Sequence, residues 1–279
     1  MDEQWKRSVG DIAETLLNGK EHNRRCSLLI GAGCSVSAGI PPASGFVSVI
    51  EKAYPLAFSR ANPKDYPHCM AQLFPGPRRD LIHELVEGDH VKVNLAHHAI
   101  AILMGSGFID RVLTTNFDSL VLRACANIGF FPAVYDFAVS DIFNPGQIYG
   151  EAIFHLHGQH SGFILLNTDE EVQNNKRKLA PVFENAGSDR TWLVVGYSGE
   201  NDPIFELLAE VNEYLHGLYW IGYGKGPPPD HVLHKLLETG KHACYVAGYD
   251  ADKFFTELTN ELGIADGRLL QTVEGWKPT

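Results

Sequence analysis

The segment Leu28-Leu29-Ile30-Gly31-Ala32-Gly33-Cys34-Ser35 places a glycine-rich turn directly after a short aliphatic run. A strand buried in a parallel sheet has such a continuous aliphatic run, and glycines after it let backbone N–H groups approach a pyrophosphate. The third glycine of the usual dinucleotide-binding fingerprint is missing, so the turn needs support from other segments. The pattern predicts a first strand near residues 26–30 and a dinucleotide site beside the turn.

Strand-like and helical segments alternate along most of the chain. Further strands are expected at residues 111–114, 152–156, 163–165, 192–195, 218–221 and 243–246. Helices are expected from the N-terminal segment up to a stop at Gly19 and at residues 119–126, 169–185, 203–216, 230–237 and 251–262. This alternation favours an α/β fold with a doubly wound, mostly parallel, Rossmann-like sheet.

Residues 43–107 have a different character, because their helical patterns are interrupted by prolines. The patterns cover residues 46–54, 80–87 and 95–104, and no strand is evident between them. We therefore expect a helical insertion at residues 43–107. The whole chain, residues 1–279, is then a single domain whose core consists of residues 27–42 and 108–265.

Composition excludes several classes of protein. With 23 basic and 34 acidic residues the net charge is −11, which argues against nucleic-acid binding. No run of 18 apolar residues predicts a membrane span, and the charged N-terminus is unlike a signal peptide, so we expect a cytoplasmic protein. The five cysteines form no Cys-x-x-Cys pair, and His97-His98 have no cysteine or carboxylate at helical spacing, so no metal site is expected.

Four segments place small or polar residues directly after an apolar strand. They are Gly31–Ser35, Thr114–Asp118, His155–Gly158 and Gly196–Ser198. Ligands of doubly wound sheets bind beyond the carboxyl ends of the strands. We therefore expect all four segments to surround one crevice.

These segments, with Gly39-Ile40-Pro41 after the first, resemble in type and order the motifs of the sirtuin superfamily. That family has a Gly-Ala-Gly-x-Ser turn, a Thr-Gln-Asn-x-Asp segment, a catalytic His-Gly and a Gly-x-Ser. The resemblance spans roughly residues 26–225 and implies a Rossmann-like fold that binds NAD+.

The departures from the sirtuin pattern bear on activity. Sirtuin deacylases carry a four-cysteine zinc module after the catalytic histidine, whereas this chain has no cysteine between Cys125 and Cys244. Thr115 replaces the glutamine of the Thr-Gln-Asn-x-Asp motif. After Gly39-Ile40-Pro41 the family has Asp-Phe-Arg, whereas this chain has residues 42–46, in which Phe46 is an aromatic in a shifted register. Residues 196–203 resemble the SIR2-like domains of bacterial antiphage defence proteins. This resemblance implies a metal-free NAD+ hydrolase (NADase) that releases nicotinamide and ADP-ribose and depletes NAD+ in abortive infection.

The resemblance also suggests a role for each motif residue. Asn116 would fix the ribose hydroxyls or a water with its amide, and His157 would act as the base, since a histidine can take a proton at cellular pH. The residues expected to bind NAD+ are Gly31, Ala32, Gly33 and Ser35 at the pyrophosphate, Asp118 at the nicotinamide carboxamide, and Gly196 and Ser198 on the adenosine side.

Several of the motif residues have a plainer structural alternative, and the Gly31/Gly33 turn could be a tight strand-to-helix connection. Asn116 or, more favourably, Asp118 could cap the helix that follows them. His157 could be a satisfied histidine of the core, and it is selected as the base by the Gly158 that follows it. His155, two residues earlier on the same strand face, is expected to be structural. Asp202-Pro203 has the pattern of a helix N-cap followed by its first residue.

Two other functions stay open on the sequence. One is a non-catalytic module that binds NAD+ or ADP-ribose and regulates another protein. The other, disfavoured by the missing zinc cysteines, is a protein deacylase. Because unrestrained NAD+ hydrolysis would kill the host, we expect control by a sensor or regulatory partner, or by homo-oligomerisation.

Overall fold

The computed structural model describes residues 3–139, 144–162, 165–187, 189–200 and 202–264. These residues form a seven-stranded sheet of order β3-β4-β2-β1-β5-β6-β7, in which every neighbouring pair is parallel. The strands are β1 (Arg25–Ile30), β2 (Ile109–Thr114), β3 (Ala133–Asp136), β4 (Ala152–His155), β5 (Arg190–Val195), β6 (Leu218–Gly222) and β7 (Ala243–Ala247). The predicted Rossmann-like α/β fold is confirmed.

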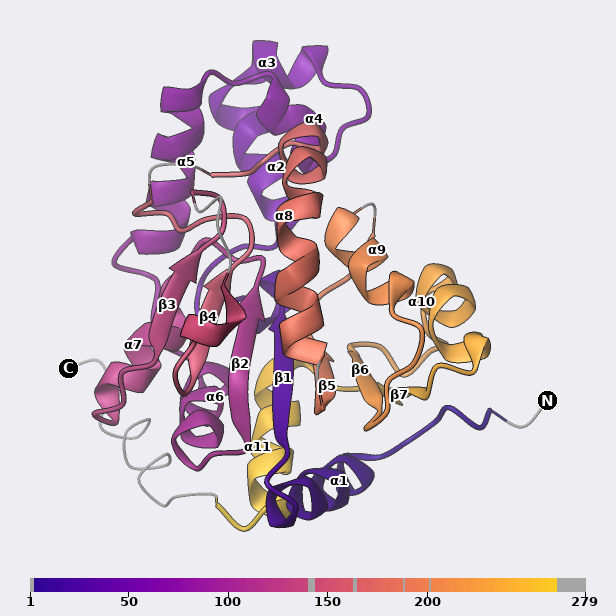
Figure 1. Cartoon of the computed structure of the whole chain (residues 1–279). Helices are drawn as coiled ribbons and strands as arrows, with labels where there is room; N and C mark the ends of the chain where they lie inside the picture. The colour runs from indigo at the N-terminus through magenta and orange to yellow at the C-terminus, as the bar shows by residue number, and fades with distance from the viewer. Residues whose placement is uncertain (1–2, 140–143, 163–164, 188, 201, 265–279) are drawn as a thin grey trace.

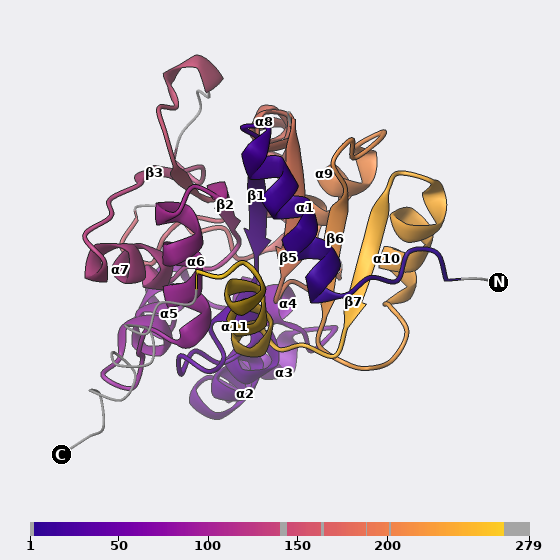
Figure 2. The same ribbon diagram turned by 90° about the horizontal axis from the view of Figure 1, so that it is seen from below.

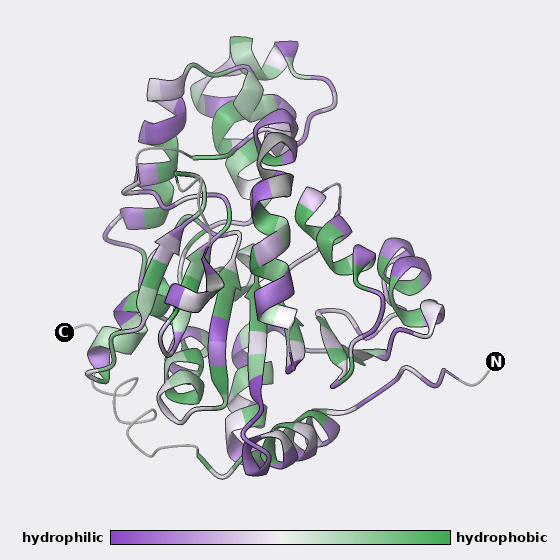
Figure 3. Cartoon of the chain, viewed as in Figure 1, coloured by the Kyte–Doolittle hydropathy of each residue, from purple (hydrophilic) through white to green (hydrophobic). Residues whose placement is uncertain are grey.

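Helices cover both faces of this sheet (Figures 1 and 2). One face packs on α1 (Val9–Glu21), α6 (Leu95–Gly105), α7 (Leu120–Asn127) and α11 (Ala251–Glu261), and the other on α8 (Asp169–Gly187), α9 (Pro203–Glu210) and α10 (Asp230–Lys235). Successive strand residues alternate between the two cores, so that Leu28 enters the first and Leu29 the second. Figure 3 shows the strands as mainly apolar and the helices as mixed, as expected for a sheet buried on both faces.

The strand order places a topological switch point at β1. From β1 the chain builds β2 and then the pair β3 and β4 on one side, and it returns through α8 to β5 on the other side of β1. The chain after β1 therefore leads to α6 on one face of the sheet, and the chain after β5 leads to α9 on the other face. A crevice at such a point is the usual ligand site of this fold.

Four further helices form a cap beyond the carboxyl ends of the strands (Figure 1). They are α2 (Ala43–Ala53), α3 (Pro55–Arg60), α4 (Tyr66–Ala71) and α5 (Pro75–Glu87), and they share a small core around Phe46, Ile50, Met70 and Ile82. Prolines stand at the starts of α3, α4 and α5, where a missing N–H costs nothing. The predicted helical character of residues 43–107 is confirmed, although α6 packs on the sheet with α7 and α11.

Some predicted boundaries were wrong. Helix α1 continues through Gly19 to Glu21, and α9 ends at Glu210 because Val211 is extended and the Tyr214 hydroxyl donates to Leu208 O (2.7 Å). Strand β3 was not predicted. The strand expected at residues 163–165 falls on positions 163 and 164, outside the described residues, and Leu165 is in no strand. Within the described part of the chain, no helix is both long and apolar enough to cross a membrane.

Candidate functional site

A crevice of about 560 Å³ lies at the carboxyl edge of the sheet, under the cap. All four segments predicted to converge contribute to its lining. Eight of the predicted site residues line it: Ala32, Gly33, Ser35, Asn116, Asp118, His157, Gly196 and Ser198. Gly31 lies next to the lining, where its carbonyl accepts a hydrogen bond from the Asn116 side chain (3.1 Å).

The glycines of the first turn let two loops meet at the switch point. A Cβ atom on Gly33 would lie 2.7 Å from Gly196 Cα, and one on Gly31 would lie 2.7 Å from Gly196 O. Gly196 itself has φ +64°, a conformation that favours glycine. Close packing of the loops after β1 and β5 therefore requires these three glycines.

The same turn uses most of its N–H groups within the protein. Those of Gly31, Gly33 and Ser35 donate to Val195 O (3.2 Å), Gly196 O (2.8 Å) and Ala32 O (3.0 Å). Binding of a pyrophosphate by these three groups would need those bonds to be replaced. This role of the turn stays a prediction, whereas its role in joining the two loops is a feature of the structure.

Asn116 is held in one orientation with its acceptor unused. Its Nδ2 group donates to Gly31 O (3.1 Å), which fixes the amide because a carbonyl can only accept, and it also donates to Ser35 Oγ (3.2 Å). Its Oδ1 atom accepts no hydrogen bond from the described residues. The side chain lines the crevice at 9% exposure, so Oδ1 is its group available to a ligand or water.

Asp118 orders the loop that carries Asn116. Its Oδ1 accepts from Leu120 N (3.0 Å) at the start of α7, and its Oδ2 accepts from the Ser35 hydroxyl (2.8 Å). Asp118 thus does the helix capping that was the alternative for Asn116. Its side chain is also in the crevice lining, so contact with the nicotinamide carboxamide stays a prediction.

His155, the last residue of β4, and His157, two residues after it, differ in their surroundings. His155 is buried, and its Nδ1 lies 3.3 Å from Asn116 O, which fits the structural alternative. His157 lines the crevice, and its Nε2 is buried without a hydrogen-bond partner among the described residues. Burial lowers the pKa of His157, with the nearby Asp202 carboxylate opposing the shift. His157 is therefore neutral at cellular pH and able to accept a proton.

Asp202 combines a capping role with a place in the crevice. Its Oδ1 accepts from Ile204 N (2.9 Å) as the N-cap of α9, as the Asp202-Pro203 pattern predicted. It also lines the crevice and faces Tyr197, whose pKa is raised well above its usual value by burial and then by this carboxylate. Helix capping and the electrostatics of the crevice thus share one carboxylate.

Three further side chains that the sequence did not assign to the site line the crevice, two from the cap and one from the segment before α8. They are Phe46, Tyr66 and Asn167, and the Tyr66 hydroxyl donates to Asn167 Oδ1 (2.8 Å). The Phe46 and Tyr66 rings meet edge to face at 5.6 Å. These residues belong to α2, α4 and the segment before α8, and no strand-end pattern identifies them.

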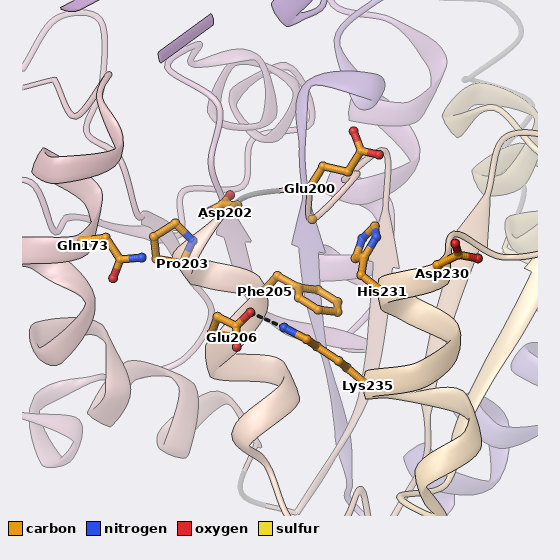
Figure 4. A pocket seen from close by; sticks show the side chains of 10 residues that line it. Gln173, Glu200, Asp202, Pro203, Phe205, Glu206, Asp230, His231 and Lys235 are labelled. Carbon is orange, nitrogen blue, oxygen red and sulfur yellow. Dashed lines mark hydrogen bonds and ion pairs between the residues drawn. The ribbon is translucent and has the colours of Figure 1, made fainter. Parts of the chain in front are cut away.

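A second pocket of about 680 Å³ adjoins the crevice beyond the loop after β5 (Figure 4). The two share Glu200, Asp202 and Pro203. In the second pocket Lys235 pairs with Glu206 (2.7 Å), as Figure 4 shows. The predicted catalytic side chains line the crevice and not this neighbour, so we place the candidate active site in the crevice.

The crevice is lined by acidic rather than basic side chains. Asp65, Asp118, Glu200 and Asp202 belong to its lining, which includes no lysine or arginine among the described residues. In the same described part of the chain, no group of three or more histidine, cysteine or carboxylate side chains could hold a metal ion.

Residues 110–245 match the family model of the SIR2-like domain. This part of the chain is a SIR2-like domain of the sirtuin superfamily. The matched segment contains Asn116, His157 and the loop after β5. The glycine turn and the cap lie before it in sequence but line the same crevice as the SIR2-like segment. SIR2-like domains bind NAD+, so the crevice is the expected place for that dinucleotide. No curated protein matches the chain.

Proposed function

We propose that this chain hydrolyses NAD+ to nicotinamide and ADP-ribose in the crevice beside Asn116 and His157. The observation that carries the proposal is that both side chains line one crevice of a SIR2-like domain, where Asn116 Oδ1 is unpaired and burial keeps the His157 ring neutral. Asn116 Oδ1 and the neutral His157 ring can each bind a donor without adding charge.

The chemistry is a displacement at C1′ of the nicotinamide ribose. The bond between C1′ and the nicotinamide nitrogen breaks, its electron pair leaves with neutral nicotinamide, and positive charge develops on the ribose. A water oxygen then bonds to C1′ and loses a proton. Asn116 Oδ1 accepts from that water or from a ribose hydroxyl, and His157 takes the proton. The carboxylates of the lining favour the developing positive charge.

Turnover and binding measured together test this proposal. The purified full chain is incubated with NAD+ while nicotinamide release is followed by chromatography, and NAD+ affinity is measured by calorimetry. We expect the wild type to release nicotinamide, and Asn116→Ala and His157→Ala to bind NAD+ but release far less. NAD+ binding without turnover by the wild type in any context, including phage-infected cells, would instead support the regulatory binding module, and absence of binding would overturn both.

We further propose that the activity serves to deplete cellular NAD+ in antiphage defence, under the control of a partner or of self-association. The similarity of residues 196–203 to antiphage SIR2-like domains supports this role, as does the toxicity of an unrestrained NADase. NAD+ is to be measured in bacteria that express the chain, before and after phage infection. Depletion that follows infection fits the proposal. A high, partner-independent rate of the purified chain that does not vary with its concentration contradicts it.

A further inference from the structure

A buried polar cluster lies beneath the glycine turn and is centred on the Ser35 hydroxyl. Ser35 Oγ lies 2.8 Å from Asp118 Oδ2, 3.2 Å from Asn116 Nδ2 and 3.4 Å from His97 Nε2. His97 comes from α6, far from the strand-end motifs in sequence, and is fully buried. The cluster therefore connects the glycine turn after β1, the Asn116 loop and α6.

The start of α6 is tied to the same turn through Asn94. The Asn94 side chain accepts from His97 N (3.0 Å) and donates from Nδ2 to Cys34 O (2.7 Å). These bonds connect the backbone of His97 with the residue before Ser35. The position of the His97 ring relative to Ser35 is thus fixed by the local structure.

Counting donors in the cluster assigns the tautomer of His97. The Ser35 hydroxyl has one proton, and its short bond to the Asp118 carboxylate uses it, because a carboxylate only accepts. Asn116 Nδ2 and His97 Nε2 must then both donate to Ser35 Oγ. Burial lowers the pKa of His97, so the ring is neutral and carries its proton on Nε2.

The other ring nitrogen argues against a role in packing alone. His97 Nδ1 is buried and has no hydrogen-bond partner among the described residues. A buried acceptor without a donor weakens folding, and an apolar side chain would avoid that loss. The Nε2 donor is therefore the feature that accounts for a histidine here.

We propose that His97 is a positioning residue for Asn116, acting through Ser35. The Nε2–H group of His97 and the Asp118 carboxylate hold Ser35 Oγ where it accepts from Asn116 Nδ2, so that Asn116 Oδ1 stays available to the crevice. The proposal rests on NAD+ hydrolysis as the function of the site. It assigns His97 no contact with the substrate.

A matched pair of substitutions separates the two ring nitrogens. In His97→Gln the amide nitrogen can reach the place of Nε2, whereas in His97→Asn the amide lies near Nδ1. We expect His97→Gln to keep kcat and His97→Asn to lose roughly tenfold in kcat at little changed KM, the factor of one neutral hydrogen bond. His98→Gln, on the next residue of α6, is the control and keeps wild-type kinetics. Equal losses in His97→Gln and His97→Asn would overturn the proposal.

A double-mutant cycle tests the route through Ser35. In the Ser35→Ala background we expect His97→Asn to cause no further loss of kcat, because the acceptor of its donor is already gone. If His97 affects only the overall stability of the protein, the two losses of kcat multiply instead, and the Tm falls in parallel with them. Multiplying losses would contradict the proposal.

Nitrogen NMR of the histidine rings provides a readout that does not depend on turnover. The His97 signals, identified by their absence from His97→Gln, are expected to show a neutral ring protonated at Nε2. A proton on Nδ1 would overturn the proposal even in an active enzyme. If the wild type does not turn over NAD+, the proposed function fails separately. NAD+ affinity then takes the place of kcat, with weaker binding in His97→Asn than in His97→Gln supporting the positioning role and equal binding overturning it.

Discussion

Replacing Asn116 by alanine removes its free acceptor, Oδ1, and two hydrogen bonds that hold the loop. The lost contact of Oδ1 with the transition state is worth about 2–4 kcal/mol, by analogy with single polar groups in other active sites, so kcat should fall roughly 30- to 1,000-fold. The bonds from Nδ2 to Gly31 O and Ser35 Oγ contribute about 0.5–1.5 kcal/mol each to stability. For a domain of this size that lowers Tm by only several degrees.

The assay compares nicotinamide release by Asn116→Ala and by the wild type at 25 °C, where both proteins stay folded. Asn185→Ala is the matched control, because Asn185 Oδ1 accepts from Arg111 Nε (3.3 Å) and the residue does not line the crevice. We expect the control, which loses one hydrogen bond where Asn116→Ala loses two, to lose less stability and almost no activity. A kcat within threefold of wild type in Asn116→Ala, or an equal loss in Asn185→Ala, would refute the reasoning.

Three more predictions concern protonation and the glycine turn. Because burial lowers the pKa of His157, kcat should hold as pH falls through about 6.5 and decline only below it; a decline already centred above 6.5 would contradict a neutral base. The pKa values of buried His97 and His155 are lowered too, so the folded state binds fewer protons than the unfolded chain, and Tm should fall as pH drops below about 6.5. A Tm that stays level down to pH 5 would argue against this. Gly33→Ala places a Cβ atom 2.7 Å from the backbone of the loop after β5 and should lower the free energy of unfolding by about 1–3 kcal/mol. Gly10→Ala, whose Cβ would lie 3.6 Å from its nearest atom, should not lower it. Urea unfolding compares the two variants, and equal stability would contradict the loop contact.

The central strands of the sheet could be predicted because their burial produces a local pattern in the sequence. Strand β1 is buried on both faces and ends in the aliphatic run Leu28-Leu29-Ile30, and the carboxyl halves of β2 and β5 show the same character. Strand β3 escaped prediction because its four residues are all only partly buried at the edge of the sheet, which leaves neither a run nor an alternation.

The candidate site was predicted as far as it depends on strand ends. Parallel strands bring their carboxyl ends to one edge, and this is why Asn116 and His157 line the same crevice. The function of a glycine, however, depends on what faces it. Gly31 and Gly33 fit an approach to a pyrophosphate by sequence, but in the structure they face the backbone of Gly196.

Residues brought to the site by tertiary packing alone had no such signal. Tyr66 arrives on the cap, and His97 meets Ser35 from a helix 62 residues away in sequence. The pattern around His97 predicted a helix and no metal site, but it carried no information about a hydrogen bond to the turn. Only the packing of α6 beneath the crevice reveals that contact.

Hydrolysis of NAD+ in H₂¹⁸O, followed by mass spectrometry of the products, tests the account most directly. We predict that the purified chain yields nicotinamide and ADP-ribose carrying one ¹⁸O at C1′, and that both Asn116→Ala and His157→Ala abolish most of this product while still binding NAD+. A cyclic product without ¹⁸O, or labelled ADP-ribose formed at the wild-type rate by both variants, would contradict it.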